Sequence, residues 1–320
     1  MTMNYYDYHK DIIFSNGGKT MKGRWLKILG VTTLALAGIC ISTGQTSESK
    51  AQTVIESTSA GGSHVEKSGG AVIDYSNTSS GYVNVKYTEK TNKTMKVQVI
   101  GPGGNTFTYT LYNTSYEVMP LTDGNGTYTV KVLKNISGST YAQVASVSFK
   151  ASLSDEFQPY IRPNQYVNYN ASTKCVKKAE SLCKKANDEL AKVKKVYKWV
   201  IKTFKYDYNK AKTVKAGYVP KLDSLFKSKK GICFDYASTM SAMLRSQGVP
   251  VKLVIGYTGK EYHAWINVYS KKKGWITGAI YLAADQWKLM DPTFASTGKS
   301  SKTVMKYINN KKNYKAKYSY

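Results

Sequence analysis

Apolar and polar residues alternate with a period of two between residues 71 and 150. The alternating segments are YVNVKYT, MKVQVI, TFTYTLY and TYTVKVL, and turn sequences such as GPGGN and DGNGT separate them. Alternation bounded by Gly- and Asn-rich turns predicts short β-strands that bury one face. Five or more strands at this spacing predict an N-terminal all-β sandwich over residues 71–150.

A helical pattern replaces the alternation after about residue 151. Residues 171–204 carry an apolar stripe at helical spacing, and the opposite face is mostly Lys. Residues 231–250, GICFDYASTMSAMLRSQGVP, predict a second helix that Gly248 and Pro250 bring to an end. VKLVIGYT, HAWINVYS, GWITGAIYL and WKLMDPTF follow and predict successive strands of a largely antiparallel sheet. The segment 151–320 is therefore expected to be an α+β domain.

The first 51 residues have the pattern of an export signal. The segment that begins at Met21 carries three basic residues, and an apolar run from Ile28 to Ile41 follows them. A run of about 14 residues suits a signal peptide and falls short of the roughly 20 that span a bilayer. An uncleaved membrane anchor is the alternative. Residues 52–70 are rich in Ser, Gly and Thr and predict a flexible linker, so the protein is expected to be secreted or associated with the cell surface.

The chain is strongly basic. Its 47 Lys and Arg residues face 20 Asp and Glu residues, which leaves a formal net charge of +27. Such an excess favours anionic surroundings. Because an exported protein rarely meets nucleic acid as its designed partner, an anionic cell-wall polymer or a membrane surface is the expected partner class, with a simply solvated surface as an equal alternative. The Lys- and Tyr-rich segment from Lys299 onward is either a surface-binding extension or a helix and strand packed on the core. Nothing in the pattern predicts an oligomeric state.

The candidate chemistry centres on Cys233, which opens the predicted helix. Unpaired backbone N–H groups and the dipole at a helix start stabilise a thiolate, and an imidazole nearby would act as general base and acid. His9 precedes the export signal and His64 lies in the predicted linker, which leaves His263 as the candidate inside this domain. The alternative for Cys233 is a buried packing role.

A third group normally orients such a base. Asp291 ends the WKLM strand before Pro292 and is the first candidate, while Asp285 precedes the strand and is its rival. Cys175 and Cys183 are expected to be packing residues, since about two helical turns hold them too far apart for a disulfide. No CxxC pair, HExxH motif or acidic ligand cluster occurs, so neither a metal nor a cofactor is expected.

Several segments together resemble the transglutaminase-like superfamily. GICFDYASTMSAMLRSQGVP, VIGY, HAWINVY and WKLMDPTF occur in the order of that family and at similar spacing, and VYKWVIKTFKYDY and KLDSLFKSKKG resemble the approach to its cysteine. The resemblance covers roughly residues 190–295 and implies a papain-like core, in which a helix bearing the Cys packs on an antiparallel sheet. It also implies Cys233 as nucleophile, His263 as base and acid, and Asp291 as the carboxylate that orients His263.

Other residues near these motifs have simpler interpretations. Asp235 is interpreted as a first-turn acid that favours the helix dipole, and Tyr236 and Trp265 as packing residues. In the β-region, LTDGNGTYTVKV is similar to the corner and strand of immunoglobulin-like domains, with Tyr128 following a tight turn. The all-β sandwich is therefore expected to be immunoglobulin-like.

The resemblance implies attack by the Cys233 thiolate on a carboxamide or peptide carbonyl, which gives a thioester that water or an amine resolves. A Gln side chain and a Lys amine would give cross-linking, whereas water would give deamidation or proteolysis. The expected function is an exported, thiol-dependent acyl-transfer enzyme that acts on proteins or peptides at the bacterial envelope, with the β-domain as spacer or docking module. The alternative is a non-catalytic surface binding or adhesion protein that uses the same fold as a scaffold.

Overall fold

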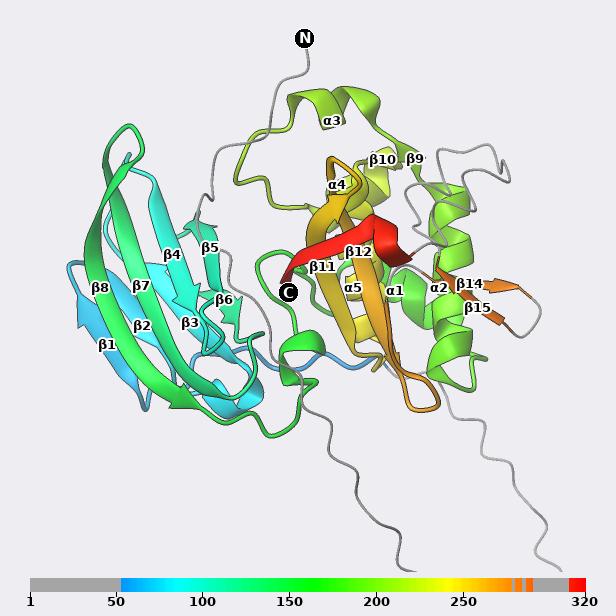
Figure 1. Cartoon of the computed structure of the whole chain (residues 1–320), viewed down its shortest axis with the longest axis horizontal. Helices are drawn as coiled ribbons and strands as arrows, with labels where there is room; N and C mark the ends of the chain where they lie inside the picture. The colour runs from blue at the N-terminus through cyan, green and yellow to red at the C-terminus, as the bar shows by residue number, and fades with distance from the viewer. Residues whose placement is uncertain (1–52, 278–279, 284–285, 290–310) are drawn as a thin grey trace, which may run out of the picture. The chain divides into compact units, whose positions relative to one another are not determined.

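The computed structural model describes residues 53–277, 280–283, 286–289 and 311–320 (Figure 1). The described residues all belong to one compact unit. The export signal predicted for residues 1–51 lies outside the described residues and stays a prediction. None of the described helices has the length and apolar character needed to cross a membrane.

Residues 65–151 form two four-stranded antiparallel sheets (Figure 1). The sheets have the strand orders β1-β2-β3-β6 and β5-β4-β7-β8. Their strands are β1 Val65–Ser68, β2 Ala71–Asp74, β3 Tyr82–Tyr87, β4 Met95–Ile100, β5 Thr106–Leu111, β6 Glu117–Pro120, β7 Gly126–Ser137 and β8 Thr140–Ala151. The inward positions Val83, Val97 and Val130 are fully buried in one core. The alternating segments thus located β3, β4, β5 and β7 correctly, because period-two alternation matches the two faces of a sheet.

Tyr128 makes the contact that defines a tyrosine corner. Its hydroxyl accepts a hydrogen bond from Asp123 N at 2.9 Å and donates to Gly124 O at 2.8 Å. This contact is a recurring feature of immunoglobulin-like sandwiches. The immunoglobulin-like assignment itself, and the boundary between residues 150 and 151, stay predictions.

Part of the segment expected to be a flexible linker is ordered by contacts with distant residues. β1 lies within residues 52–70 and pairs with β2 in antiparallel register. Ahead of it, Gly62 N donates to Asp74 Oδ2 at 2.7 Å and Asn84 Nδ2 donates to Thr58 O at 2.9 Å. Composition could not reveal this, because the partners that hold the segment come from β2 and β3.

The described residues after Ala151 combine helices with a third four-stranded antiparallel sheet, so the α+β prediction is confirmed (Figure 1). The sheet has the order β13-β12-β11-β16. A short parallel pair is formed by β9 and β10, and β10 leads directly into α5. The helices are α1 Lys174–Cys183, α2 Glu189–Thr203, α3 Tyr208–Thr213, α4 Leu222–Ser228 and α5 Cys233–Arg245. The strands are β9 Lys205–Tyr206, β10 Lys230–Gly231, β11 Val251–Thr258, β12 Glu261–Ser270, β13 Gly274–Ile276 and β16 Tyr314–Ser319.

Three 3₁₀ turns and one hairpin complete the described elements. The turns are η1 Thr78–Ser80, η2 Gln158–Tyr160 and η3 Lys311–Asn313. The hairpin consists of β14 Ile280–Ala283 and β15 Gln286–Leu289, which pair with each other in a two-stranded sheet of their own. GWITGAIYL is therefore divided between two strands. The pattern had predicted that WKLM continues the sheet that contains β12, whereas β15 pairs with β14 in a separate sheet. Alternation indicates that a segment is a strand and does not indicate its partner.

The C-terminal segment closes the other edge of the main sheet. β16 pairs antiparallel with β11, and the register shifts between Ile255 and Gly256. Tyr320, which is buried, exchanges backbone hydrogen bonds with Leu253. For residues 314–320 the structure therefore agrees with a strand packed on the core rather than a surface extension.

The apolar stripe over residues 171–204 forms two helices instead of one. Asp188 has an extended backbone and caps α2, with Oδ1 accepting from Ala191 N at 2.8 Å. An Asp in this position satisfies an N–H group that would otherwise lack a partner, and it starts a new helix. Cys175 and Cys183 still share one helix, α1.

Aromatic side chains join the β-rich region to the helical region. Tyr320 contacts Phe107 and Tyr109 of β5, with ring centroids 5.9 and 5.8 Å apart. Tyr166 lies in the segment between the two regions, and its ring centroid is 4.7 Å from that of Tyr320 and 5.4 Å from that of Phe234. The buried core is therefore continuous from β5 to the first turn of α5.

Candidate functional site

Cys233 occupies the first helical position of α5. Ile232 precedes it with an extended backbone, at φ −99° and ψ 176°, and has no polar atom with which to cap the helix. The first N–H groups of an α-helix lack partners within the helix, and here they surround a cysteine that is partly exposed. This arrangement can stabilise an anion on sulfur or on a substrate oxygen.

The turn that leads into Cys233 is held by backbone contacts on both sides. β10 pairs with β9, so that Gly231 lies opposite Tyr206, and Asp207 N donates to Gly231 O at 2.9 Å. A Cβ atom at Gly231 would lie 2.6 Å from Leu225 Cδ1 and 2.8 Å from Asp235 Cβ. A side chain at this position would therefore displace Leu225 and Asp235, in α4 and the first turn of α5.

Asp235 is more than a first-turn acid. Its side chain is 1% exposed, and its Oδ2 accepts a hydrogen bond from Ile232 N at 2.8 Å, which forms the acid half of a capping box. Lys210 Nζ lies 2.7 Å from Oδ2, and the Tyr218 hydroxyl donates to Oδ1. A buried carboxylate with a complete set of partners thus lies two residues after the candidate nucleophile.

Lys210 and Tyr218 are the residues that sequence reasoning missed. Lys210 belongs to α3 and Tyr218 to the loop after it, and Lys210 Nζ also donates to the Tyr218 hydroxyl at 2.6 Å. Burial, followed by the charge of Asp235, raises the pKa of Tyr218 well above its usual range, so the phenol keeps the proton that it donates. A Lys or Tyr in a Lys- and Tyr-rich chain gives no sequence signal of such a role, whereas Asp235 was recognisable from its position in the helix.

His263 lies on β12, the strand that packs directly against α5. It is 7% exposed, and it pairs across the sheet with Gly256 of β11. Its ring lies 6.4 Å from that of Trp265, with an angle of 20° between the planes. A Cβ atom at Gly256 would approach Lys315 O to 2.1 Å and the Trp265 ring to 2.9 Å, so glycine is required where β16 crosses this point.

Among the other candidate residues, Asp291 and its rival Asp285 lie outside the described residues, and their roles stay predictions. Tyr236 and Trp265 are buried, at 0% and 1% exposed, as expected of packing residues.

Cys175 and Cys183 are buried free thiols, which confirms the expectation of packing residues without a disulfide between them. Burial is the main cause that raises the pKa of Cys175 to about 12 and that of Cys183 to about 11. Neither thiol is therefore suited to act as a nucleophile near neutral pH.

Arg245 anchors the opposite end of α5. Its guanidinium is 1% exposed and donates to the backbone oxygens of Val251, Arg162 and Tyr320 at distances from 2.7 to 3.1 Å. Burial lowers the pKa of Arg245 to about 10. These contacts tie the helix that bears Cys233 to β11 and to the C-terminal strand segment.

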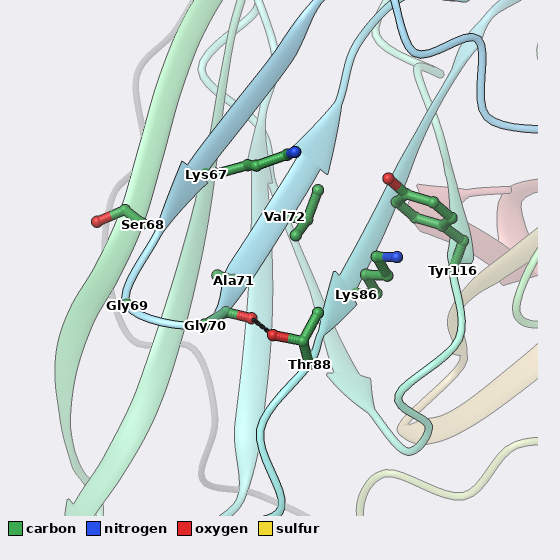
Figure 2. A pocket seen from close by; sticks show the side chains of 9 residues that line it. All are labelled: Lys67, Ser68, Gly69, Gly70, Ala71, Val72, Lys86, Thr88 and Tyr116. Atoms are coloured by element: carbon green, nitrogen blue, oxygen red, sulfur yellow. Dashed lines mark hydrogen bonds between the residues drawn. The ribbon is translucent and has the colours of Figure 1, made fainter.

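A separate basic hollow lies on the sheet β1-β2-β3-β6 (Figure 2). Its volume is about 480 Å³, and Lys67, Val72 and Lys86 are cross-strand neighbours in its floor. Lys86 Nζ lies 4.3 Å from the centroid of the Tyr116 ring. Figure 2 shows the two amines on either side of Val72, above the turn at Gly69–Gly70. This hollow belongs to the β-rich region and shares no residue with the surroundings of Cys233.

Comparison with known proteins places the helical region in a family context. Residues 176–278 match the model of the transglutaminase-like superfamily. The chain is 35% identical over 71 residues to the uncharacterized protein YebA of Bacillus subtilis, and 32% identical over 69 residues to a protein-glutamine gamma-glutamyltransferase of Pseudomonas aeruginosa. Each match covers 17% of this chain and 10% of the relative, so the chain spans about a tenth of the length of these relatives.

Two solved structures are similar in outline. A putative cysteine protease from Cytophaga hutchinsonii has a TM-score of 0.35 at 15% identity, covering 66% of this chain and 78% of that chain. Red sea bream transglutaminase has a TM-score of 0.29 at 11% identity, covering 66% and 48%. Both scores are low, and neither similarity bears on the chemistry of this chain. The match to the family model therefore supports the transglutaminase-like superfamily, a family of cysteine-dependent enzymes, for residues 176–278, the segment that contains Cys233 and His263.

Proposed function

We propose that this protein is a thiol-dependent acyl-transfer enzyme with Cys233 as nucleophile, His263 as general base and acid, and Asp291 as the carboxylate that orients His263. One observation carries the proposal: the cysteine at the first position of α5 lies on the helix that packs against the strand bearing His263, within the segment that matches the superfamily. The substrate is a carboxamide or peptide carbonyl of a protein.

The reaction proceeds in two acyl-transfer steps. His263 takes the proton of the Cys233 thiol, and the sulfur forms a bond to the carbonyl carbon. The negative oxygen of the tetrahedral intermediate accepts hydrogen bonds from N–H groups in the first turn of α5. The C–N bond then breaks, and the leaving nitrogen takes the proton from His263. An amine or water attacks the thioester, again with His263 as base, and releases the thiol.

The acceptor decides the product. A Lys amine that attacks the thioester of a Gln side chain forms an isopeptide cross-link, whereas water gives deamidation of a Gln side chain or cleavage of a peptide bond. All three outcomes use the same three side chains, so the proposal covers the acyl-enzyme step and leaves the acceptor to experiment.

Mass spectrometry of bacterial envelope proteins incubated with the purified protein tests the proposal. Cross-linking joins two peptides, deamidation adds about one mass unit to a Gln, and cleavage creates new termini. We expect one of these changes with the parent protein and with C175A, and none with C233A. If C233A produces the same changes as the parent, the enzyme proposal is wrong.

A non-catalytic adhesion protein is the competing function. It predicts that C233A retains both target binding and any cellular phenotype, since the fold alone would then be required. The basic hollow on the β-rich region would suit such a role, although it is equally compatible with an enzyme that docks on its substrate surface. The C233A comparison separates the two, because only the enzyme loses its effect.

Docking on an anionic wall polymer at the envelope is part of the proposed function. The net charge of +27 and the paired amines of Lys67 and Lys86 support it. Cosedimentation with purified anionic wall polymer should weaken in K67E/K86E more than in K131E/K150E, which makes the same charge change on β7 and β8. Equal weakening by both double variants would show that binding depends on net charge and not on the hollow. Binding to anionic vesicles without binding to the polymer would show that the partner is a membrane surface.

A further inference from the structure

We propose that Lys210, Tyr218 and Asp235 are positioning residues of the Cys233 centre: Asp235 holds the turn before the nucleophile, and Lys210 neutralises the charge that this contact places beside the thiolate. The inference rests on the proposed role of Cys233 as nucleophile. It assigns a positioning role to an ion pair with a buried carboxylate that would otherwise be a structural tie.

The contact between Asp235 and the turn is direct. Asp235 Oδ2 accepts from Ile232 N at 2.8 Å, and Ile232 immediately precedes Cys233. The peptide that connects Gly231 to Ile232 is therefore held on both sides: Asp235 accepts from its N–H, and Asp207 N donates to its carbonyl oxygen. A nucleophile on such a turn keeps one position relative to the carbonyl it attacks.

The same contact carries an electrostatic cost. An ionised carboxylate that is 1% exposed lies two residues from Cys233, where a like charge disfavours a thiolate. Lys210 Nζ at 2.7 Å compensates this charge, and the Tyr218 hydroxyl donates to the second oxygen. The carboxylate can then hold the turn without opposing the ionisation that the chemistry needs.

Lys210 is held in register with the nucleophile turn by an independent set of contacts. Asp207 caps α3, with Oδ1 accepting from Lys210 N at 2.9 Å. The backbone N–H of Asp207 donates to Gly231 O at 2.9 Å. Asp207 thus links the first turn of the helix that carries Lys210 to the strand that leads into Cys233.

Six ionisable groups of the described residues lie in or beside the first turn of α5, among the partners of Asp235, or on the strand packed against α5. They are Cys233 and Asp235 on α5, Lys210 on α3, Tyr218 in the loop after α3, Lys230 on β10 and His263 on β12. Changing the charge at Lys210 and Asp235 separately, with the others intact, isolates the compensation.

The experiment measures the rate at which iodoacetamide alkylates Cys233 in the full chain between pH 5 and pH 10, with peptide mass spectrometry to assign the site. K210M leaves Asp235 uncompensated, and its rate at pH 7 should fall at least fivefold while its profile moves to higher pH. D235N keeps an oxygen that accepts from Ile232 N and removes the negative charge, so its rate should equal or exceed that of the parent. K210M/D235N should return to within twofold of the parent.

Controls separate this role from a purely structural one. K212M changes an exposed Lys on the same helix and should leave the profile unchanged. Circular dichroism reports whether each variant is folded. A structural tie predicts that K210M and D235N both lose stability and shift the profile in the same direction, with the double variant no better, and that result would overturn the inference. If K210M does not fold, D235N decides, and a rate below one third of the parent rejects the inference.

Alkylation requires no substrate, so the two proposals fail separately. If C233A retained acyl-transfer activity while the opposite shifts of K210M and D235N were observed, the proposed function would fall and the charge compensation would stand. If C233A were inactive and the profiles of K210M and D235N shifted in the same direction, the proposed function would stand and the charge compensation would fall.

Discussion

α1 and α5 each carry cysteine, and they differ in where the thiol lies along the helix. Cys175 and Cys183 sit within the buried face of α1, which packs against α5, whereas Cys233 opens α5 and is partly exposed. Burial raises the pKa of both α1 thiols. The comparison teaches that the position of a residue at a helix start, with its free N–H groups, separates a chemical role from a packing role that the residue type alone does not reveal.

The largest effect that would test this comparison is the loss of the thiol itself. C233A should lower acyl transfer by at least about a thousandfold, since removal of a nucleophile removes the covalent route. C175A and C183A, measured under conditions where circular dichroism shows them folded, should stay within threefold of the parent. A large loss of activity in a folded C175A would place the chemistry on α1.

Loss of the base should have the next largest effect. H263A should lower acyl transfer by about a hundredfold to ten-thousandfold, the usual contribution of a positioned acid–base group. His64, which is exposed in the β-rich region, provides the matched control, and H64A should change the rate by less than twofold. Equal losses in the two variants would remove His263 from the mechanism.

The reactivity of the three thiols compares the two helices directly. Iodoacetamide at pH 7.5 should modify Cys233 at least tenfold faster than Cys175 or Cys183 in the folded protein, because the α1 thiols are both buried and protonated at this pH. In denaturant the three rates should converge. Equal rates in the folded protein would remove the case for an activated thiolate at Cys233.

The smallest effect concerns stability at high pH. The pKa of Cys175 is raised from 9.0 to about 12 and that of Cys183 to about 11, so the folded state retains protons that the unfolded chain releases above pH 9. This contribution to stability is complete below pH 9 and is lost as the pH rises towards 11 and 12. The slope of unfolding free energy against pH should therefore be shallower in C175A/C183A, by up to about 1.4 kcal/mol per pH unit for each thiol.

Urea unfolding at pH 9, 10 and 11 measures that slope. V176A removes buried volume from α1 without removing an ionisable group, so it should lower stability and leave the slope as in the parent. Identical slopes in C175A/C183A and the parent would show that the buried thiols do not contribute to the pH dependence.

Much of the fold was predictable because its signal is local. β3, β4 and β11 follow the predicted segments closely, and α5 begins at Cys233, the residue expected to open the helix. Asp235 was visible as a first-turn acid for the same reason. The partners of these elements were not predictable: β16 at the edge of the sheet, the separate β14–β15 hairpin and the ordered segment before β2 all depend on pairing between residues far apart in sequence.

The local sequence by itself determined that Cys233 starts a helix and that His263 begins a strand-like segment, since helical spacing and alternation are properties of short segments. Only the tertiary structure decided which charge accompanies the nucleophile. Lys210 and Tyr218 reach Asp235 because α3 and the loop after it fold over the first turn of α5. A buried carboxylate requires a partner, and the chain supplies that partner through the fold rather than through any spacing along the sequence.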